Sequence, residues 1–310
     1  MAEKLKITFL GTSGAIPTAR RNHPATVLKY KNETILIDCG EGTQRQFRKA
    51  KLNPCKITKI LITHWHGDHT LGLAGLLQTL IMNGYRGNLE IHGPIGTKNE
   101  IDLLISTHLQ SYFKFANETN SDLKIATFDH KIGKIIETEE FLIETIPISH
   151  TCRGLSYSFT IKEKQRLNKE KLKKLKIPNG PLLGELAKGK KIKLDGKEIN
   201  GKEFIYLEQK KKLTLITDTS YKEELSNFAK GSDLLICEST HSKEENEIAE
   251  SHGHLTSHQA AKIAKDAKVK KLALIHLSQR YDAIPKKILD EAKEIFKETI
   301  IPKDLDYLEL

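Results

Sequence analysis

The sequence lacks any hydrophobic run of about 18 residues, the length that a membrane-spanning helix requires. It also has little cysteine: Cys39, Cys55, Cys152 and Cys237 are scattered, and no two of them form a Cys-x-x-Cys pair. We therefore expect reduced thiols in a cytoplasmic protein and not a disulfide scaffold. The first residues lead directly into a strand-like segment, so we expect no signal peptide and no association with a membrane.

The positive charge of the chain is concentrated in one segment. The 310 residues carry a net charge of +10, and residues 162–212 alone contain 17 Lys or Arg and 7 Asp or Glu. Such a concentration suits contact with a polyanion, although a solvated lysine-rich surface gives the same pattern. Because residues 165–202 offer few side chains for a core, we expect an extension from one domain that spans 1–310.

Short apolar segments alternate with segments of helical length along the chain. The expected strands are Leu5–Leu10, Ala25–Tyr30, Thr34–Asp38, Ile57–Thr63, Asn88–His92, Phe141–Ser149, Lys212–Thr217, Asp233–Glu238 and Lys271–His276. The expected helices are Leu71–Met82, Glu100–Phe115, Asn168–Lys176, Ser257–Ala267 with Ser257 as N-cap, and Pro285–Lys297. A rigid turn at 177–181 and a hairpin at 195–196 are expected between them. This alternation indicates a layered α/β fold.

Four potential metal ligands fall within six residues, at a turn from a predicted strand to a predicted helix. They are His64, His66, Asp68 and His69. Burying several imidazoles and a carboxylate together is costly unless a cation satisfies them. The spacing His-x-His-x-Asp-His in this context therefore predicts a metal site.

Further ligands are expected where other strands end. His150, Asp218 and His276 each follow an apolar run that we predict to be a strand. Nitrogen and oxygen donors of this kind suit Zn²⁺, with Mn²⁺ or Fe²⁺ as substitutes. Two ions that share Asp218 would activate water and bind the oxygens of a phosphoester, with Asp68 as the proton acceptor.

The His64–His69 motif resembles the hallmark of the metallo-β-lactamase superfamily, and other motifs are similar to those of its ribonuclease Z family. These other motifs are FLGTSGAIP at 9–17, DCGEGTQRQ at 38–46, TDT at 217–219, HLTSHQAA at 254–261 and HLSQRY at 276–281. The resemblance covers nearly the whole chain, at the length of the family's short form. It implies an αββα sandwich, in which two mixed sheets lie between helices, with a protruding basic arm.

The resemblance also implies a role for individual residues. One zinc ion would be held by His64, His66 and His150, a second by Asp68, His69 and His276, with Asp218 as the bridge. Glu238 and His254 would help to protonate the leaving ribose oxygen. The family often has His-Glu-Ala-Thr where residues 237–240 read Cys-Glu-Ser-Thr, so the glutamate and threonine are kept. Ser278 and Arg280 are predicted to contact a phosphate.

Residues 165–202 resemble the family's flexible arm, an exosite for tRNA. The residues expected to serve this contact are Lys171, Lys173, Lys174, Gly180, Pro181, Lys188, Lys190 and Lys191. Lysines of this kind neutralise phosphates without reading sequence. The family pattern thus implies a cytoplasmic, homodimeric endoribonuclease that removes the 3′ trailer from precursor tRNA.

Two other functions fit parts of the pattern. A small-molecule hydrolase of the same superfamily (a phosphodiesterase, lactonase or thioesterase) would share the metal site but would not need the arm. A non-catalytic RNA-binding protein that has lost its metals would have broken ligand motifs, whereas every candidate ligand is present here. We interpret His92 and His108 as packed or surface residues.

Overall fold

The computed structural model describes residues 4–115, 121–174, 180–194 and 197–310, and two seven-stranded sheets form its centre. The first sheet runs, in spatial order, β18 (Tyr307–Glu309), β1 (Lys6–Gly11), β2 (Ala25–Tyr30), β3 (Glu33–Ile37), β4 (Lys59–Leu61), β5 (Arg86–Pro94) and β6 (Asp122–His130). The second runs β17 (Thr299–Ile300), β16 (Leu272–Ile275), β15 (Leu234–Glu238), β14 (Lys211–Ile216), β9 (Leu155–Ile161), β8 (Phe141–Pro147) and β7 (Gly133–Glu137). Both sheets are mixed, because each combines parallel and antiparallel pairs.

Eleven α-helices accompany these strands in the described part of the chain. They are α1 (Thr43–Lys49), α2 (Gly67–Thr70), α3 (Leu73–Met82), α4 (Thr97–Leu104), α5 (Gln110–Phe115), α6 (Lys169–Lys174), α7 (Pro181–Ala187), α8 (Glu223–Ala229), α9 (Asn246–His252), α10 (Ser257–Asp266) and α11 (Pro285–Ile295). None of the helices in these residues is both long and apolar enough to cross a bilayer.

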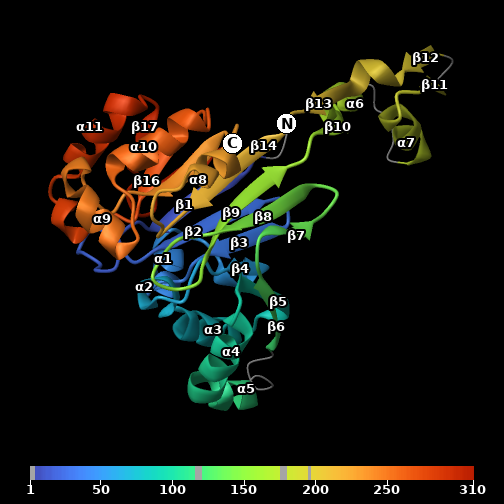
Figure 1. Ribbon diagram of the computed structural model, residues 1–310. Coiled ribbons are helices and arrows are strands. Elements are labelled where there is room, and N and C mark those ends of the chain that lie inside the picture. Colours follow the sequence, from blue (N-terminus) through green and yellow to red (C-terminus); the bar gives the residue numbers. More distant parts are fainter. Residues whose placement is uncertain (1–3, 116–120, 175–179, 195–196) are drawn as a thin grey trace.

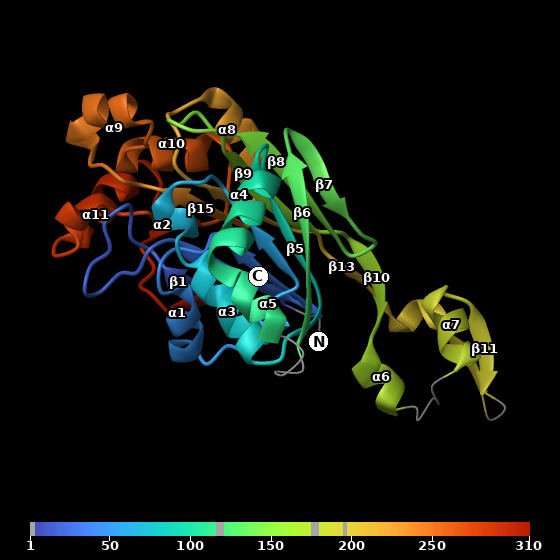
Figure 2. The same ribbon diagram turned by 90° about the horizontal axis from the view of Figure 1, so that it is seen from below.

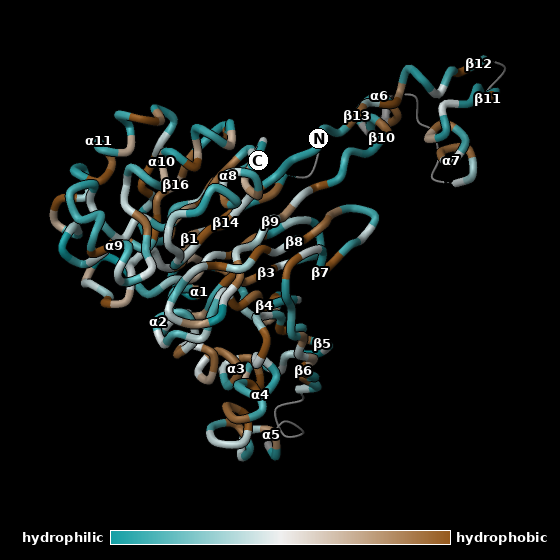
Figure 3. Tube along the Cα trace, viewed as in Figure 1, coloured by the Kyte–Doolittle hydropathy of each residue, from teal (hydrophilic) through white to brown (hydrophobic). Residues whose placement is uncertain are grey.

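The sheets pack face to face and helices cover their outer faces, as Figure 1 shows. Between the sheets lies one apolar cluster, to which Phe9, Ile37 and Tyr157 belong. A second cluster joins the first sheet to α1, α3 and α4, and a third joins the second sheet to α8, α10 and α11. In Figure 3 the hydrophobic segments accordingly follow the central strands and α3. The expected αββα sandwich is confirmed.

Several element boundaries differ from the expectation. The N-cap of α10 is Thr256 and not Ser257: the Thr256 side chain accepts a hydrogen bond from the Gln259 amide, and Gln259 bonds back to the Thr256 amide. This reciprocal pair satisfies two otherwise free amides at the helix start. The predicted helix over 100–115 begins earlier, at Thr97, and passes through a π-helical turn at Ile105–Leu109 into α5.

The pattern did not predict five strands of the two large sheets: β6, β7, β9, β17 and β18. The strand β9 is the most instructive of these, because all seven of its residues are buried. Its sequence, LSYSFTI, alternates large apolar side chains with small hydroxyl side chains. The large residues face the other sheet and the hydroxyls lie on the helix side, so the alternation was present but was masked by polar residues that are also buried.

Residues 164–208, here called the arm segment, lie apart from both large sheets. The segment contains β10 (Lys164–Leu167), which pairs with β13 (Ile205–Glu208), and β11 (Lys191–Leu194), which pairs with β12 (Lys197–Asn200). Figures 1 and 2 show it to one side of the sandwich, beyond the ends of β9 and β14. The turn at 177–179 and the hairpin tip at 195–196 lie outside the described residues, although the two hairpin strands are present.

The few apolar side chains of this segment form a small cluster. Leu172, Leu186, Ile192 and Phe204 are buried together, with four partly buried aliphatic side chains around them. These residues are widely spaced along the sequence and lie among lysines, so they give no periodic apolar signal. The cluster gives the arm segment a small core that is separate from the three clusters of the sandwich.

Candidate metal centre

The candidate ligands gather at one edge of the sandwich, where strands of both sheets end. In the first sheet β3 and β4 are parallel, and the His64–His69 turn follows β4. In the second sheet β14, β15 and β16 are parallel, with Asp218 shortly after β14 and His276 directly after β16. Because parallel strands present their carboxyl ends to the same side, these residues converge, as α/β folds place their sites. His150 comes from the loop after β8, three residues beyond the strand end.

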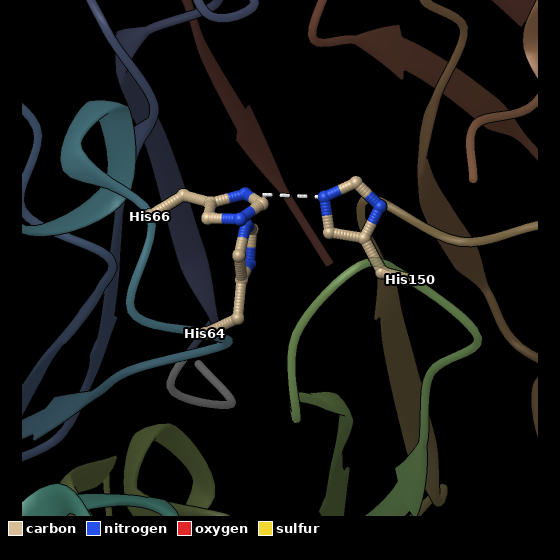
Figure 4. Close-up of side chains that lie close together, drawn as sticks. All are labelled: His64, His66 and His150. Atoms are coloured by element: carbon tan, nitrogen blue, oxygen red, sulfur yellow. Dashed lines mark hydrogen bonds between the residues drawn. The ribbon is translucent and has the colours of Figure 1, made fainter. Parts of the chain in front are cut away.

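Three imidazoles form the first group. His64, His66 and His150 each offer a ring nitrogen, and these atoms lie within 4.8 Å of one another. Figure 4 shows the three rings around a common space, with His66 Nδ1 and His150 Nε2 3.1 Å apart. His64 and His66 come from the first sheet side and His150 from the second, so this group spans the two sheets.

A second group lies beside the first and contains both carboxylates. Asp68, His69, Asp218 and His276 also offer ligand atoms within 4.8 Å of one another. Asp218 lies between the groups: its Oδ2 is 3.2 Å from His276 Nε2 and 3.7 Å from His64 Nε2. The structure therefore brings together all seven residues that the sequence singles out as ligands.

Other residues fix the orientation of these imidazoles through the second ring nitrogen. His69 Nδ1 donates to Asp38 Oδ2 at 2.7 Å, and His150 Nδ1 donates to the Gly253 carbonyl at 2.9 Å. Each bond leaves the Nε2 atom of the same ring to face the site, which is the arrangement usual for histidine ligands of metals. Sequence reasoning missed this role of Asp38. The available signal was a carboxylate directly after an apolar strand, the same relation that pointed to Asp218.

Three of the strand-end residues adopt a backbone conformation that is unfavourable for them. Asp38, Asp218 and His276 have φ values of 57°, 41° and 57°, in the left-handed region. Such residues cost of order 1–3 kcal/mol each and persist where the surrounding structure requires them. Because all three residues lie at strand ends around one site, we infer that the surrounding structure holds this backbone conformation and thereby directs the three side chains toward the site.

The donor set fits a divalent metal. His64 Nε2, His69 Nε2 and Asp218 Oδ1 are buried and have no hydrogen-bond partner among the described residues. Buried polar atoms are normally paired, since each unpaired one costs about 1–3 kcal/mol. Three such atoms at one place are explained by a cation that accepts their lone pairs. The protein is accordingly expected to work with a divalent metal cofactor.

Electrostatics keep both carboxylates and His64 in the state that binds a cation. Burial would raise the pKa of Asp68 and Asp218, but the nearby rings of His276 and His69 outweigh it and hold both pKa values well below the usual range. Burial lowers the pKa of His64, and the charge of His69 adds to this effect. Ionised carboxylates and a neutral imidazole are the forms that coordinate metals. His69 differs: burial lowers its pKa, but the charges of Asp218 and Asp38 outweigh this and hold that pKa well above its usual range, so His69 must release a proton to bind a cation.

Glu238 and His254 form a pair beside the second group. His254 Nδ1 lies 3.2 Å from both carboxylate oxygens of Glu238, which is fully buried at the end of β15. Burial lowers the pKa of His254, but the Glu238 charge outweighs it and raises that pKa to about 9. Thr240 donates to Glu238 Oε2 at 2.6 Å and lies 2.9 Å from His276 Nδ1, so it connects this pair to the candidate ligands.

The remaining singled-out residues lie at the margin of the site or away from it. Arg280 is exposed and donates to Glu245 at 2.6 Å, while Ser278 is partly buried just after His276. His108 is exposed, and His92 is buried against His130. Of the arm lysines, Lys188 and Lys190 pair with Glu185, Lys191 pairs with Glu198, and Lys171 donates to the Glu203 carbonyl. The side chains of Lys173 and Lys174 lie outside the described residues.

Comparison with known proteins identifies the class. The human tRNase Z, short form, has a similar structure, with a TM-score of 0.67 and 24% identity over 98% of both chains. The metallo-β-lactamase fold protein YhfI of Bacillus subtilis matches over the whole of both chains with a TM-score of 0.68 and 19% identity. Identities this low show the fold alone. The chain therefore has the metallo-β-lactamase fold, and its candidate ligands form one cluster at an edge of that fold.

The sequence matches are more specific. A family model described as "Anti-Pycsar protein Apyc1" matches residues 5–171, which include His64–His69 and His150 but end before Asp218. A ribonuclease Z of Prochlorococcus marinus (strain NATL1A) is 39% identical over 318 aligned residues, covering 99% of both chains. This second match includes every residue of the candidate site. The chain belongs to the ribonuclease Z family.

Proposed function

We propose that this chain is the endoribonuclease that removes the 3′ trailer from precursor tRNA and leaves a 3′-hydroxyl on the tRNA. The observation that carries the proposal is the set of buried, unpaired ligand atoms on His64, His69 and Asp218, in a chain whose full-length relatives are named ribonuclease Z. The superfamily alternative, a small-molecule hydrolase, would use the same ligand atoms and differs from this proposal in its substrate.

In the proposed site two Zn²⁺ ions would be bound. His64, His66 and His150 would hold one, Asp68, His69 and His276 the other, and Asp218 would contact both. The all-nitrogen and oxygen donor set suits zinc, and Mn²⁺ or Fe²⁺ could substitute. When bound, such ions lower the pKa of water and stabilise negative charge on phosphate oxygens.

Asp68 is proposed to accept the proton that the attacking water loses. Its carboxylate is ionised, and it lies 3.3 Å from both His69 Nε2 and His276 Nε2, so it is held at the second ligand group. Its side chain is 9% exposed, which leaves it within reach of the space above the ligands. A positioned carboxylate of this kind contributes typically 10²–10⁴-fold to the rate of a proton transfer.

His254 is proposed to donate a proton to the departing ribose oxygen as the phosphorus–oxygen bond breaks. The adjacent Glu238 carboxylate favours the protonated imidazole and holds Nδ1, which leaves the other ring nitrogen for the substrate. The water oxygen remains on phosphorus, so the trailer departs with the phosphate. Ser278 and Arg280, next to His276 in the chain, are proposed to contact a phosphate of the RNA.

The arm segment is proposed to bind tRNA away from the cleavage site. Lys171, Lys188, Lys190 and Lys191 are exposed. Exposed ion pairs such as Lys190–Glu185 are worth little, so these lysines can exchange a glutamate for a phosphate. Structured RNA is recognised mainly through its shape and backbone, which suits such a surface. By resemblance to the family, the protein would act as a homodimer in the cytoplasm.

The test is incubation of a 3′-extended precursor tRNA with the wild-type protein and with Asp68→Ala, with metal supplied to both. We expect the wild type to release the trailer and the variant to leave the RNA intact. If the wild type also left the RNA intact but hydrolysed bis(p-nitrophenyl) phosphate, the small-molecule alternative would replace this proposal.

A further inference from the structure

The backbone connects the arm segment to the sandwich at β9 and β14. Residues of β9 and β14 pair as far as Ile161 and Lys211, and pairing resumes between Lys164 in β10 and Glu208 in β13. Residues 162–163 and 209–210 separate the two ladders and belong to neither. Two-stranded ribbons twist more than wide sheets and are marginally stable alone. The joint by itself therefore does not fix the direction in which the arm segment points.

One of the carboxylates at this joint receives three cations. Glu140, in the turn between β7 and β8, accepts hydrogen bonds from Lys31, from Lys164 at 2.9 Å and from both terminal nitrogens of Arg166. Arg166 also donates through Nε to Glu208 at 2.7 Å. The guanidinium thus bridges one acid of the sandwich and one acid of the arm segment.

These partners belong to three parts of the molecule. Lys31 lies in the turn between β2 and β3 of the first sheet, Glu140 in the second sheet, and Lys164 with Arg166 on β10 of the arm segment. The Glu140 carbonyl also accepts from the Lys162 amide at 2.9 Å, at the start of the unpaired joint. One residue therefore ties the arm segment to both sheets.

The surroundings make this contact stronger than an ordinary surface pair. The side chains of Glu140 and Arg166 are 28% and 24% exposed, and that of Glu208 is only 9% exposed. Exposed pairs contribute little, but two-point contacts with arginine that form part of a network hold a defined geometry. Hydrogen bonding from Arg166 is the largest cause that holds the pKa of Glu140 well below its usual range.

We propose that Glu140 is a positioning residue that fixes the direction of the arm segment, so that tRNA bound there presents its 3′ end to the metal centre. This rests on the proposed function of the arm segment. If only a fraction of molecules holds the arm in the competent direction, the apparent affinity for tRNA falls by that fraction. The candidate metal centre itself should be unaffected, because none of its candidate ligands contacts this network among the described residues.

The test is Glu140→Gln, which keeps the size of the side chain and removes its charge. We expect KM for precursor tRNA to rise roughly three- to tenfold, with kcat and the hydrolysis of bis(p-nitrophenyl) phosphate unchanged. The direction of the change in KM is informative, because loss of a negative charge beside a basic surface would by itself lower KM for RNA.

Glu139→Gln is the matched control. Glu139 precedes Glu140, is 91% exposed and lies 3.4 Å from Lys164. It undergoes the same change of charge, and we expect no rise in KM. Arg166→Gln should reproduce the Glu140→Gln effect, and the double variant should be no worse than either single one. An unchanged or lowered KM in Glu140→Gln overturns the inference.

The proposed arm function is tested separately by replacing Lys188, Lys190 and Lys191 with alanine. If that triple variant cleaves precursor tRNA with the wild-type KM, the arm proposal fails. If it raises KM while Glu140→Gln does not, the arm proposal stands and the positioning inference alone is lost. An equal loss of activity on tRNA and on the small phosphodiester in Glu140→Gln would indicate a general structural role and would also overturn it.

Discussion

Charged side chains gather in two regions of this molecule, and what surrounds them differs. At the metal centre His64, His69 and Asp218 are at most 2% exposed, and each has a ligand atom without a hydrogen-bond partner in the described chain. In the arm segment Lys188 and Lys190 are 68% and 58% exposed and are paired with Glu185. Burial of unpaired polar atoms is costly and calls for a ligand, whereas exposed charges cost little and identify none.

The difference between the two regions predicts the largest effect at Asp218, which lies between the two ligand groups. We expect the Asp218→Ala variant to lose bound metal and to lower kcat/KM for precursor tRNA by at least about a thousandfold. Without the metal, the negative charge that develops on the phosphate oxygens in the transition state is no longer stabilised. Elemental analysis of the purified protein and a cleavage assay measure the two effects.

Asp233→Ala is the matched control for that variant. Asp233 is also a buried aspartate, but it binds the Lys212 amide and Lys270 before β15 begins, at the opposite end of the strand from Glu238. The Asp233→Ala variant should be less stable than the wild type but should keep its bound metal. Wild-type metal content in Asp218→Ala would show that this carboxylate is not a ligand.

The second test concerns the Glu238–His254 pair. We expect Glu238→Gln to reduce kcat by about a hundredfold, within the range typical of proton transfer, and to change the pH profile. In the wild type Glu238 outweighs the effect of burial and raises the pKa of His254, so the donor proton is kept until the pH rises through that value. Without this charge the pKa falls and the loss of activity on the alkaline side moves to lower pH.

The measurement is kcat against pH for the wild type and for the Glu238→Gln variant. Bound cations repel the imidazolium in both proteins, so the difference between the two profiles is the informative quantity. If activity fell at the same alkaline pH in both proteins, Glu238 would not set the pKa of the proton donor. His258→Ala is a suitable control, since that histidine is partly exposed and pairs with Glu294.

A third, smaller effect is expected at Asp38, which orients His69. Asp38→Asn should weaken metal affinity by about 10–100-fold, the usual cost of losing such a partner, while kcat with saturating metal stays closer to the wild-type value. Metal titration of the apoprotein measures this. Asp129→Asn is the control, because this carboxylate binds the Gly96 and Lys98 amides and none of the candidate ligands among the described residues. Equal affinity in Asp38→Asn and the wild type would contradict the orienting role.

The two regions also differ in how far the sequence predicts them. The His64–His69 motif is local, and Asp218 and His276 follow apolar strands, so short-range patterns were enough to bring them together. The strand β9 escaped because its buried hydroxyls obscure the alternation. Glu140 gave no signal at all, because its partners lie 109 residues before it and 26 residues after it, and only the fold places them beside it.

The smallest predicted effect concerns the arm lysines and is visible mainly through salt. If Lys188, Lys190 and Lys191 contact phosphates, their replacement by alanine reduces the slope of log affinity against log salt concentration by roughly two to three. Lys98, Lys124 and Lys134 are the matched set, since they are 59–69% exposed and each pairs with an acid outside the arm segment. Their replacement removes the same charge from the protein. If both triple variants reduce the slope equally, the affinity for tRNA depends on the net charge of the protein and not on the position of the lysines. The concentration of lysine in the arm segment would then be the solvated surface that its exposed ion pairs also allow.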